Sequence, residues 1–363
     1  MKPKLVDLFC GIGLGALGFL RAGFEVIAAV DNDGEACKLY ERNVGIKPIE
    51  GDLRKISGRH ILEIIGAKRG EIDLVCGCPP CQGFSSLRMT RLGKKKKGKN
   101  RKDARKSFLK VFAQRIDEIY PKAFVLENVR GLTFRRNTRY LREFLAYMRR
   151  LGYSCKYAVL DAADYGVPQR RKRLIVIGSR VQSPELPKPT HSDPALNAGR
   201  PPWITVREAI GNLPRLSAGR MAPNDVLHSA ADHSEAVLKI IRHIPHDGGS
   251  RRSLPQRLWL PCHKKLTKHE RRGAESIYGR MRWAEPSPTI TTRFHTPACG
   301  RFVHPNQNRG ISIREAARLQ SAPDDLRIAG SKDRMAMWIG NGFPPLLSEA
   351  IGFQAKACLN LPN

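Results

Sequence analysis

Residues 4–31 read KLVDLFCGIGLGALGFLRAGFEVIAAVD and contain the pattern on which the fold depends. KLVDLF is a short apolar stretch with the composition of a buried strand. A glycine-rich turn leads from it into the apolar-periodic segment LGALGFLRAG, in which Gly23 is placed to end a helix. FEVIAAV then forms a second strand that ends at Asp31. A strand, a helix and a second strand in this order predict a βαβ unit.

The glycine-rich turn also predicts a ligand. Gly13, Gly15 and Gly18 satisfy G-x-G-x-x-G, and Asp31 stands at the tip of the next strand, where a carboxylate accepts hydrogen bonds from ribose hydroxyls. The pattern favours an adenosine-containing cofactor but does not distinguish a dinucleotide from S-adenosylmethionine, and tight strand–helix packing also accounts for the glycines. Asp52, in the GDL where a third strand would end, either faces an adenine amino group or is a solvated turn residue.

The same alternation continues through the first half of the chain. EIDLVCG, KAFVLENV and RRKRLIVIGSR have the composition of further strands, and helix-like segments such as SFLKVFAQRIDEIYP lie between strands. Strands that alternate with helices predict an α/β fold, here a Rossmann-like, doubly wound parallel sheet with helices on both faces.

The composition changes near Val181. The chain becomes rich in proline and loop residues, and regular patterning returns only with SIREAARLQ, where Ser312 and Glu315 have the spacing of a capping box. We therefore expect a catalytic domain formed by residues 1–180 and 332–363, a smaller irregular domain over 181–310, and a connecting hinge and helix over 311–331.

The charge balance points to a polyanionic partner. The 363 residues include 64 Lys and Arg against 33 Asp and Glu, a net charge of +31 with a pI near 10.3. Nucleic acid is the simplest partner for such a surface, although an acidic membrane or protein would also bind it. No apolar run reaches the roughly 18 residues of a membrane span, and no secretory signal is present. We expect a cytoplasmic protein whose nine cysteines are reduced thiols.

Three of those cysteines lie close together in DLVCGCPPCQGFSSL, residues 73–87. A structural zinc site needs a fourth ligand and usually a second cluster, whereas the adjacent Cys262 and His263 lack a partner at a suitable spacing. We therefore expect no metal. Cys76 and Cys78 lie on or just after an apolar strand and are read as buried packing residues.

Cys81 has a different setting. Pro79 and Pro80 end the strand and stiffen the loop that follows it. This places the Cys81 thiol beyond the carboxyl edge of the sheet, where open α/β folds bind their ligands. The thiol is a candidate nucleophile, provided that positive neighbours or a helix N-terminus favour the thiolate.

A candidate acid and candidate cations occupy other strand tips. VLENV places Glu127 at the end of one strand, and QRRKR places Arg170, Arg171 and Arg173 just before another. Each residue alone could form a surface ion pair. Together, at one edge of the sheet, they favour a catalytic cluster.

These residues resemble the DNA (cytosine-5) methyltransferases of bacterial type, in order and over nearly the whole chain. DLFCGIGLG resembles the cofactor motif of that family, PPCQGFS its nucleophile motif, ENVRGL its acid motif and QRRKR its Q-x-R-x-R motif. PTITTR with SIREAARLQ resembles the segment that leads out of the recognition domain, and IGNGFPPLLSEAIG the closing motif.

The resemblance implies methyl transfer from S-adenosylmethionine to C5 of a cytosine in double-stranded DNA, without a metal. Cys81 would attack C6, Glu127 would donate a proton to N3, Arg171 would contact O2 of the base, and Arg173 would help to hold the site together. The target base must be flipped out of the duplex to be reached from both faces. Residues 181–310 would be the target-recognition domain.

The resemblance also implies the remaining binding residues. The cofactor site would be formed by Phe9, Gly11, Ile12, Gly13, Asp31, Asn32, Asp52, Leu53, Pro80 and Asn341. DNA would be contacted by the basic loop after the nucleophile motif, through Ser85, Lys94, Lys95, Lys96, Lys97 and Arg101. A monomer suffices for one flipped base, and a cognate restriction or mismatch-repair endonuclease is a further partner that fits the family.

The sequence departs from the family pattern at three positions. Asp31 replaces the usual Glu, Ala322 a common Phe, and Gly342 the usual Ala or Ser. An RNA cytosine-5 methyltransferase on the same fold is the nearest alternative, although the Cys-Phe-Thr signature of the tRNA-modifying subgroup is missing. An NAD-dependent oxidoreductase would not explain PPCQ, ENV or the charge, and the intact Cys81 and Glu127 argue against a catalytically silent DNA-binding relative.

Overall fold

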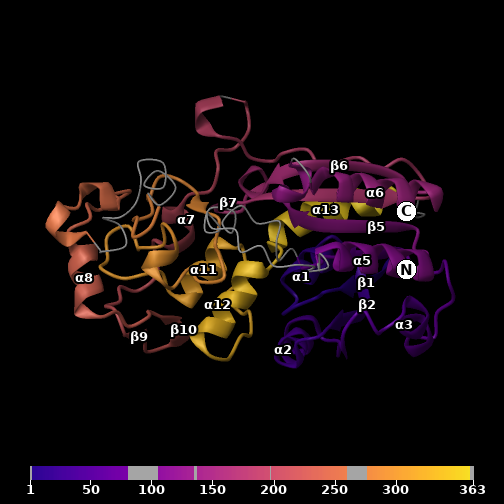
Figure 1. Ribbon diagram of the computed structural model, residues 1–363, viewed down its shortest axis with the longest axis horizontal. Coiled ribbons are helices and arrows are strands. Elements are labelled where there is room, and N and C mark those ends of the chain that lie inside the picture. Colours follow the sequence, from indigo (N-terminus) through magenta and orange to yellow (C-terminus); the bar gives the residue numbers. More distant parts are fainter. Residues whose placement is uncertain (1, 81–104, 135–136, 197, 260–275, 360–363) are drawn as a thin grey trace, which may run out of the picture. The chain divides into compact units, whose positions relative to one another are not determined.

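The computed structural model describes the chain except for residues 1, 81–104, 135–136, 197, 260–275 and 360–363. The chain forms two compact units (Figure 1). Unit 1 comprises Met1–Asp161, Lys172–Pro189 and Gly342–Asn363, and unit 2 comprises Ala162–Arg171 and Thr190–Asn341. The segments 162–171 and 332–341 pack with unit 2, whereas the sequence pattern placed them with the catalytic part. The functional division into domains stays a prediction.

A seven-stranded sheet in the order β3-β2-β1-β4-β5-β8-β6 forms the centre of unit 1. Its strands are β1 (Lys4–Leu8), β2 (Glu25–Asp31), β3 (Ile49–Glu50), β4 (Leu74–Gly77), β5 (Ala123–Val129), β6 (Ser154–Asp161) and β8 (Lys172–Ser179). The first five in chain order pair in parallel, which confirms the predicted doubly wound α/β fold.

One strand corrects the expectation of a wholly parallel sheet. β8 runs antiparallel to both of its neighbours, β5 and β6. Only residues 162–171 connect β6 to β8, and a parallel connection needs a crossover of about a dozen residues or more, usually a helix. The short link therefore returns the chain in the opposite direction.

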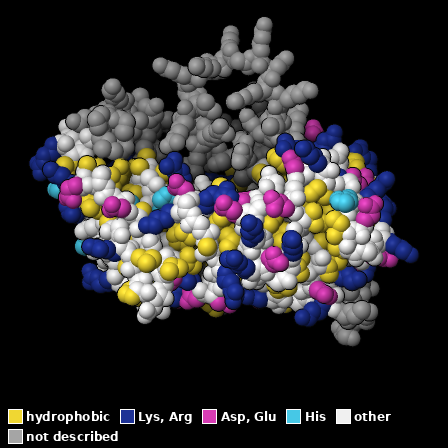
Figure 2. All heavy atoms as spheres, turned by 90° about the horizontal axis from the view of Figure 1, so that it is seen from below, with side chains coloured by type: hydrophobic (Ala, Val, Ile, Leu, Met, Phe, Trp, Pro, Cys, Tyr) yellow, Lys and Arg dark blue, Asp and Glu magenta, His cyan; other side chains and the backbone are white. Residues whose placement is uncertain are grey.

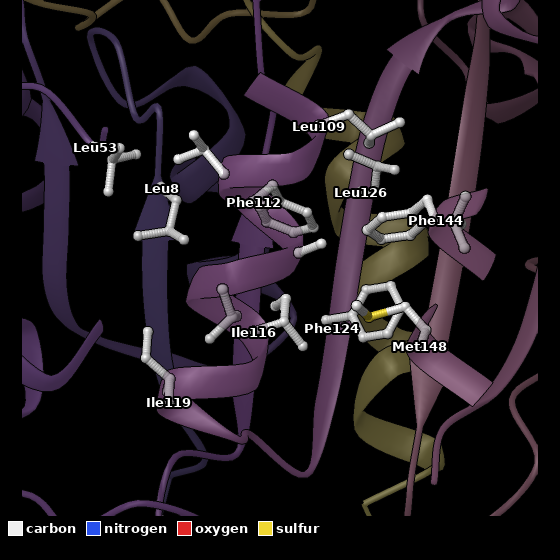
Figure 3. Close-up of a cluster of buried hydrophobic side chains, with 14 of the residues drawn as sticks. Leu8, Leu53, Leu109, Phe112, Ile116, Ile119, Phe124, Leu126, Phe144 and Met148 are labelled. Atoms are coloured by element: carbon white, nitrogen blue, oxygen red, sulfur yellow. The ribbon is translucent and has the colours of Figure 1, made fainter. Parts of the chain in front are cut away.

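Helices cover both faces of this sheet. The helices are α1 (Leu14–Arg21), α2 (Gly34–Val44), α3 (Gly58–Ile64), α5 (Arg105–Ile119), α6 (Thr138–Arg150) and α13 (Pro345–Ala357). Leu109, Phe112 and Ile116 recur at helical spacing on α5 and pack on Phe124 and Leu126 of β5, in a core that includes side chains of α3 and α6 (Figure 3). Helix α13 lies behind the sheet in the same view.

Helices α1 and α13 approach each other closely because both carry small residues at their contact. A Cβ atom at Gly18 of α1 would lie 2.0 Å from Ser348 Oγ and 2.2 Å from the Pro345 carbonyl oxygen of α13. Pro345 stands in the first turn of α13, where its missing N–H leaves no intrahelical bond unmade. Segments from opposite ends of the chain thus share one interface.

We predict that Gly18→Ala destabilises the protein by about 1–3 kcal/mol, because the added methyl group overpacks the contact with backbone atoms that cannot turn away. Gly15→Ala is the matched control on the same helix, since its Cβ would stand 3.3 Å from the Phe343 side chain, a contact that a small shift relieves. Both variants exchange glycine for alanine within α1. Urea unfolding followed by circular dichroism measures the difference, and equal stability of the two variants would contradict the assignment of Gly18 to helix packing.

Unit 2 has short elements and much irregular chain, as its composition predicts. Its helices are α7 (Val206–Ile210), α8 (Glu235–Arg242), α11 (Ile313–Leu319) and α12 (Lys332–Asn341), and its paired strands are β7 (Gln169–Arg170) with β11 (Ser287–Pro288) and β9 (Met221–Ala222) with β10 (Asp225–Ser229). Within the described ranges, every helix of the protein falls short of the length and apolarity that a membrane span requires.

The interior of unit 2 contains charged side chains. Arg280 and Arg309 are fully buried, and the Arg280 guanidinium donates to the carbonyl groups of Ile241, Ile244 and His304. The predicted capping box of α11 is confirmed: Ser312 Oγ accepts from the Glu315 N–H, and the Glu315 carboxylate accepts from the Ser312 N–H. Polar groups that satisfy one another thus add to a small apolar core, which includes Ile240, Ile241 and Val303, in holding this unit together.

Candidate active site at the carboxyl edge of the sheet

The parallel strands of unit 1 all end at one edge of the sheet. β1, β2, β4 and β5 deliver the glycine-rich turn, Asp31, the Pro79–Pro80 loop and Glu127 to this edge. β8 runs the other way, so it begins there, and its Arg173 pairs in register with Val129 at the end of β5. Ligands bind at this edge in open α/β sheets.

The glycine-rich turn is held by the end of β2. Oδ2 of Asp31 accepts a hydrogen bond from the Gly11 N–H at 2.9 Å, and Oδ1 accepts from the Asp33 N–H at 3.0 Å. Burial raises the pKa of Asp31 above its ordinary value, and the two backbone donors oppose that rise. Asp31 is therefore part of the turn itself, in addition to its predicted role toward ribose.

Two positions of the turn, Gly11 and Gly13, require glycine for different structural reasons. Gly11 has φ +54, and a Cβ there would meet no atom within 4 Å, so its backbone borders open space. Gly13 has φ +91, and a Cβ there would stand 2.7 Å from Val44 and 3.2 Å from the Tyr40 ring. An accessible backbone at Gly11, beside a carboxylate at a strand tip, fits the close approach of an adenosine-containing ligand.

The other predicted cofactor residues have varied settings. Asp52 is half-buried and accepts hydrogen bonds from the Arg54 backbone and guanidinium, and the latter lowers the pKa of Asp52. Leu53 is buried in the core, and its carbonyl accepts from Arg115. Ile12 is buried, Phe9 is half-buried, and Asn32, Pro80 and Asn341 are exposed. Asn341 ends α12 in unit 2, so its approach to the cofactor stays a prediction.

The loop that leads to the nucleophile motif is anchored to the acid motif. Asn128 Nδ2 donates to the Pro79 carbonyl oxygen at 3.2 Å, and Asn128 is buried. Sequence reasoning did not single out Asn128, although its place in ENV is a signal. Cys81 itself lies outside the described residues.

The neighbouring cysteines have the properties of packing residues. Cys76 is buried in β4, and burial raises the pKa of its thiol. A hydrogen bond with Cys76, together with burial, raises the pKa of Cys78 well above its ordinary value. Both thiols stay protonated at neutral pH, which makes them poor nucleophiles.

Glu127 and Arg173 form a buried ion pair. Arg173 Nε lies 2.8 Å from Glu127 Oε1, and the two side chains are 13% and 11% exposed, respectively. The structure thus brings together a predicted acid and a predicted cation from adjacent strands. A buried pair with its own charge balance holds the carboxyl group in one place.

Arg171 and Gln169 belong to unit 2 and are almost fully buried. The terminal nitrogens of Arg171 donate to the carbonyl oxygens of Ile290 and Gly340, at 3.1 and 3.0 Å. Gln169 donates to the Leu319 carbonyl and accepts from the Ile290 N–H. The predicted contact between Arg171 and the base O2 is not tested by these bonds and stays a prediction.

The predicted DNA-contacting residues Ser85, Lys94, Lys95, Lys96, Lys97 and Arg101 all lie outside the described residues. In the described part of the chain, Figure 2 shows Lys and Arg side chains spread over the visible face, with Asp and Glu among them. Within that same part, no group of three or more His, Cys, Asp or Glu side chains could hold a metal ion.

Several known proteins resemble this chain over most of its length. The family model of the C-5 cytosine-specific DNA methylases matches residues 3–357. The type II methylase M.HgiDII of Herpetosiphon aurantiacus is 33% identical over 99% of this chain and 96% of its own length. The type II methyltransferase M1.HphI of Haemophilus parahaemolyticus is also 33% identical, over 99% of this chain and 88% of its own length.

The fold has a counterpart among solved structures. A protein described as a DNA modification methyltransferase encoded within a prophage (E. coli) superposes with a TM-score of 0.73 at 22% identity, over 99% of this chain and 100% of that one. At this identity the likeness concerns the fold.

Proposed function

This chain belongs to the C-5 cytosine-specific DNA methylase family, and from that premise we propose that it methylates C5 of a flipped-out cytosine within a specific sequence of double-stranded DNA. The methyl donor in this proposal is S-adenosylmethionine, and the reaction runs through a covalent bond between Cys81 and C6 of the base. The observation that carries the proposal is the Glu127–Arg173 pair at the same sheet edge as the glycine-rich turn.

The chain's own residues account for the steps of this reaction. Glu127 first takes up a proton from water. The Cys81 thiolate then adds to C6 while Glu127 donates this proton to N3, so that the electrons of the C5–C6 double bond become available at C5. C5 takes the methyl group. A base, for which a water molecule is our candidate, then removes the C5 proton. The sulfur–C6 bond breaks, the thiolate leaves, and Glu127 recovers its proton from N3.

Arg173 has a positioning role in this scheme. Its guanidinium fixes one carboxylate oxygen of Glu127 at 2.8 Å and keeps the carboxyl group at the strand tip. Asn128 fixes the Pro79 carbonyl, which precedes Cys81 by two residues. The acid and the loop of the nucleophile are therefore held through adjacent residues of β5, Glu127 and Asn128.

The cofactor would be held at the glycine-rich turn, where it supplies an electrophilic methyl group on a sulfonium sulfur. Gly11 offers its backbone, Asp31 would accept from ribose with lone pairs that the Gly11 and Asp33 N–H groups do not use, and Asp52 would face the adenine. Phe9, Ile12, Asn32, Leu53, Pro80 and Asn341 would complete the site.

DNA is the proposed partner, in line with a net charge of +31. The names of the relatives suggest a type II restriction-modification setting, with a cognate endonuclease as a second partner. We propose that the enzyme acts as a monomer.

The test is transfer of labelled methyl groups from S-adenosylmethionine to unmethylated genomic DNA or to total tRNA. We expect label in DNA, mapped by bisulfite sequencing to 5-methylcytosine within one short sequence. Label that enters only tRNA would assign the protein to RNA methylation. DNA binding without transfer to either substrate would indicate a silent relative.

We predict that Glu127→Gln lowers the turnover rate by about 10²–10⁴-fold, because the amide cannot transfer a proton to N3. Gln keeps the size of the side chain, so affinity for S-adenosylmethionine should change little. Glu143→Gln on the exposed surface of α6 is the control and should retain full activity. A Glu127→Gln enzyme with an unchanged turnover rate would exclude Glu127 as the acid.

A further inference from the structure

Asp7 is a buried carboxyl group directly before the cofactor turn, and no step of the proposed reaction uses it. It lies on β1 between Val6 and Leu8, whose side chains join the core beneath α5. Because side chains alternate along a strand, Asp7 points to the opposite face, toward α2. Its side chain is almost wholly buried there, and its Oδ2 accepts a hydrogen bond from the Tyr40 hydroxyl at 3.2 Å.

Tyr40 connects Asp7 to the turn. Tyr40 is fully buried on α2, and its ring lies against Gly13, where a Cβ would stand 3.2 Å from Cδ2. Gly13 has φ +91, and a side chain there would have to move both Val44 and this ring. A change in the hydrogen bond between Asp7 and Tyr40 therefore acts directly on the packing of the turn.

The titratable groups around Asp7 provide no positive charge in the described part of the chain. They are Tyr40 on α2, Asp31 at the end of β2, Cys10 in the turn, and Cys76 and Cys78 at the end of β4. Burial raises the pKa of Asp7 to about 7, against the effect of the Tyr40 hydrogen bond, and the charge of Asp31 raises it further. Asp7 thus changes its charge near neutral pH. Among these neighbours no group compensates its negative charge, so a bound cation would have to do so.

The two ligands of the proposed reaction differ in charge at one atom. S-adenosylmethionine carries a positive sulfonium, whereas the product S-adenosylhomocysteine has a neutral thioether and otherwise the same polar groups. Hydrogen bonds to the adenosine and amino-acid parts cannot separate them. A buried negative charge near the turn stabilises only the cation, and in a region of low dielectric its effect is weakly screened.

We propose that Asp7, acting with Tyr40, is a positioning residue beneath the cofactor turn that makes the site prefer the cationic methyl donor over its neutral product. This proposal rests on S-adenosylmethionine being the cofactor. The preference favours replacement of the product by a new donor molecule, because the product loses this stabilisation as soon as the methyl group has left. By linkage, binding of the donor favours the ionised form of Asp7, so the preference should strengthen as pH rises through neutrality.

Equilibrium binding of both ligands without DNA tests the proposal, by calorimetry at about pH 6 and about pH 8. We expect the ratio of the product Kd to the donor Kd to rise at least about threefold across this range in the unaltered protein. Asp7→Asn should abolish the rise. Tyr40→Phe should retain it but move its midpoint to higher pH, because the hydrogen bond that favours ionised Asp7 is lost.

Glu41→Gln, on the exposed side of α2, is the matched control and should behave as the unaltered protein. A ratio that does not change with pH, or that changes equally in Asp7→Asn, would overturn the proposal. Asp31 would then be the group to examine, because its pKa is also raised. If Asp7→Asn does not fold, Tyr40→Phe decides. A midpoint of the rise in the Kd ratio that moves to higher pH supports the proposal, and an unchanged midpoint overturns it. Failure of both ligands to bind at either pH would overturn the choice of cofactor and this proposal with it.

Discussion

Cys81→Ala is expected to reduce methyl transfer by on the order of 10⁴-fold or more, to the level of background. C5 of cytosine is not nucleophilic enough to take a methyl group until a nucleophile has added to C6, and alanine cannot add. Binding of S-adenosylmethionine should be unaffected, because the cofactor turn lies on another strand. The loss therefore appears in the turnover rate and not in the affinity.

Two measurements distinguish this loss from a general defect. Transfer of labelled methyl groups gives the rate, and DNA with 5-fluorocytosine at the target position gives the covalent adduct. Because fluorine at C5 cannot leave as a proton would, the bond between enzyme and base persists and the complex survives denaturation. We expect this complex with the unaltered protein and not with Cys81→Ala.

Cys78→Ala is the matched control. Its thiol has a pKa raised well above the ordinary value, through its hydrogen bond with Cys76 and burial, so it is not available as a thiolate. This variant should keep most of its activity and form the covalent complex. If the adduct required Cys78, or if Cys81→Ala kept its activity, Cys81 would not be the nucleophile and another residue would have that role.

Glu315→Gln is expected to destabilise unit 2 by about 3–5 kcal/mol, because it leaves Arg309 buried without its counter-charge. Both terminal nitrogens of Arg309 donate to the Glu315 carboxylate, at 2.8 and 2.7 Å, and the two side chains are 0% and 1% exposed. Gln keeps the shape of Glu and part of its capping contact, so the loss of charge is the main change.

Tryptophan fluorescence during urea unfolding measures this effect on unit 2. All four tryptophans of the protein, Trp203, Trp259, Trp283 and Trp338, lie within this unit. Glu208→Gln is the control, because Glu208 completes the capping box of α7 but is exposed, and its loss should cost about 1 kcal/mol or less. Similar shifts in both variants would show that the buried pair adds nothing beyond helix capping.

The stabilisation of unit 2 by the Arg309–Glu315 pair should also depend on pH. The hydrogen-bonded Arg309 lowers the pKa of Glu315 to about 2, against the effect of burial, from an ordinary value of 4.5. A folded-state pKa below the unfolded one means that the stabilisation is complete above about pH 4.5 and is lost as pH falls toward 2. The unaltered protein and Glu315→Gln should therefore converge in stability in acid.

The sequence predicted those parts of the fold that depend on local pattern. The βαβ unit of residues 4–31 and the capping box of Ser312 and Glu315 were read from spacing alone, because hydrophobic periodicity and capping act between near neighbours. The grouping of Glu127 with Arg173 followed from their places at strand tips, since the tips of a sheet meet at its edges.

Contacts between distant residues could not be read in this way. The direction of β8 is not encoded in its alternation, because a strand has the same pattern whichever way it runs. The partner of Glu315 could have been any of many arginines, and only the fold brings Arg309 to it. Asp7 looked like an ordinary strand residue, because only the tertiary fold buries it and brings Tyr40 of α2 and Asp31 of β2 close to it.

The pairing of α1 with α13 has a consequence for the protein during its synthesis. Phe19 on the buried side of α1 and Ala22 directly after this helix pack against Gly352 of α13, and most of the chain separates these two helices. At the rate of ribosomal synthesis, roughly tens of seconds therefore pass between the synthesis of α1 and the synthesis of α13, which covers it. Throughout that time the nascent chain presents an apolar helix face, so a chaperone that shields such a surface should raise its yield. Chains that stop before residue 345 should aggregate, whatever the state of their catalytic residues.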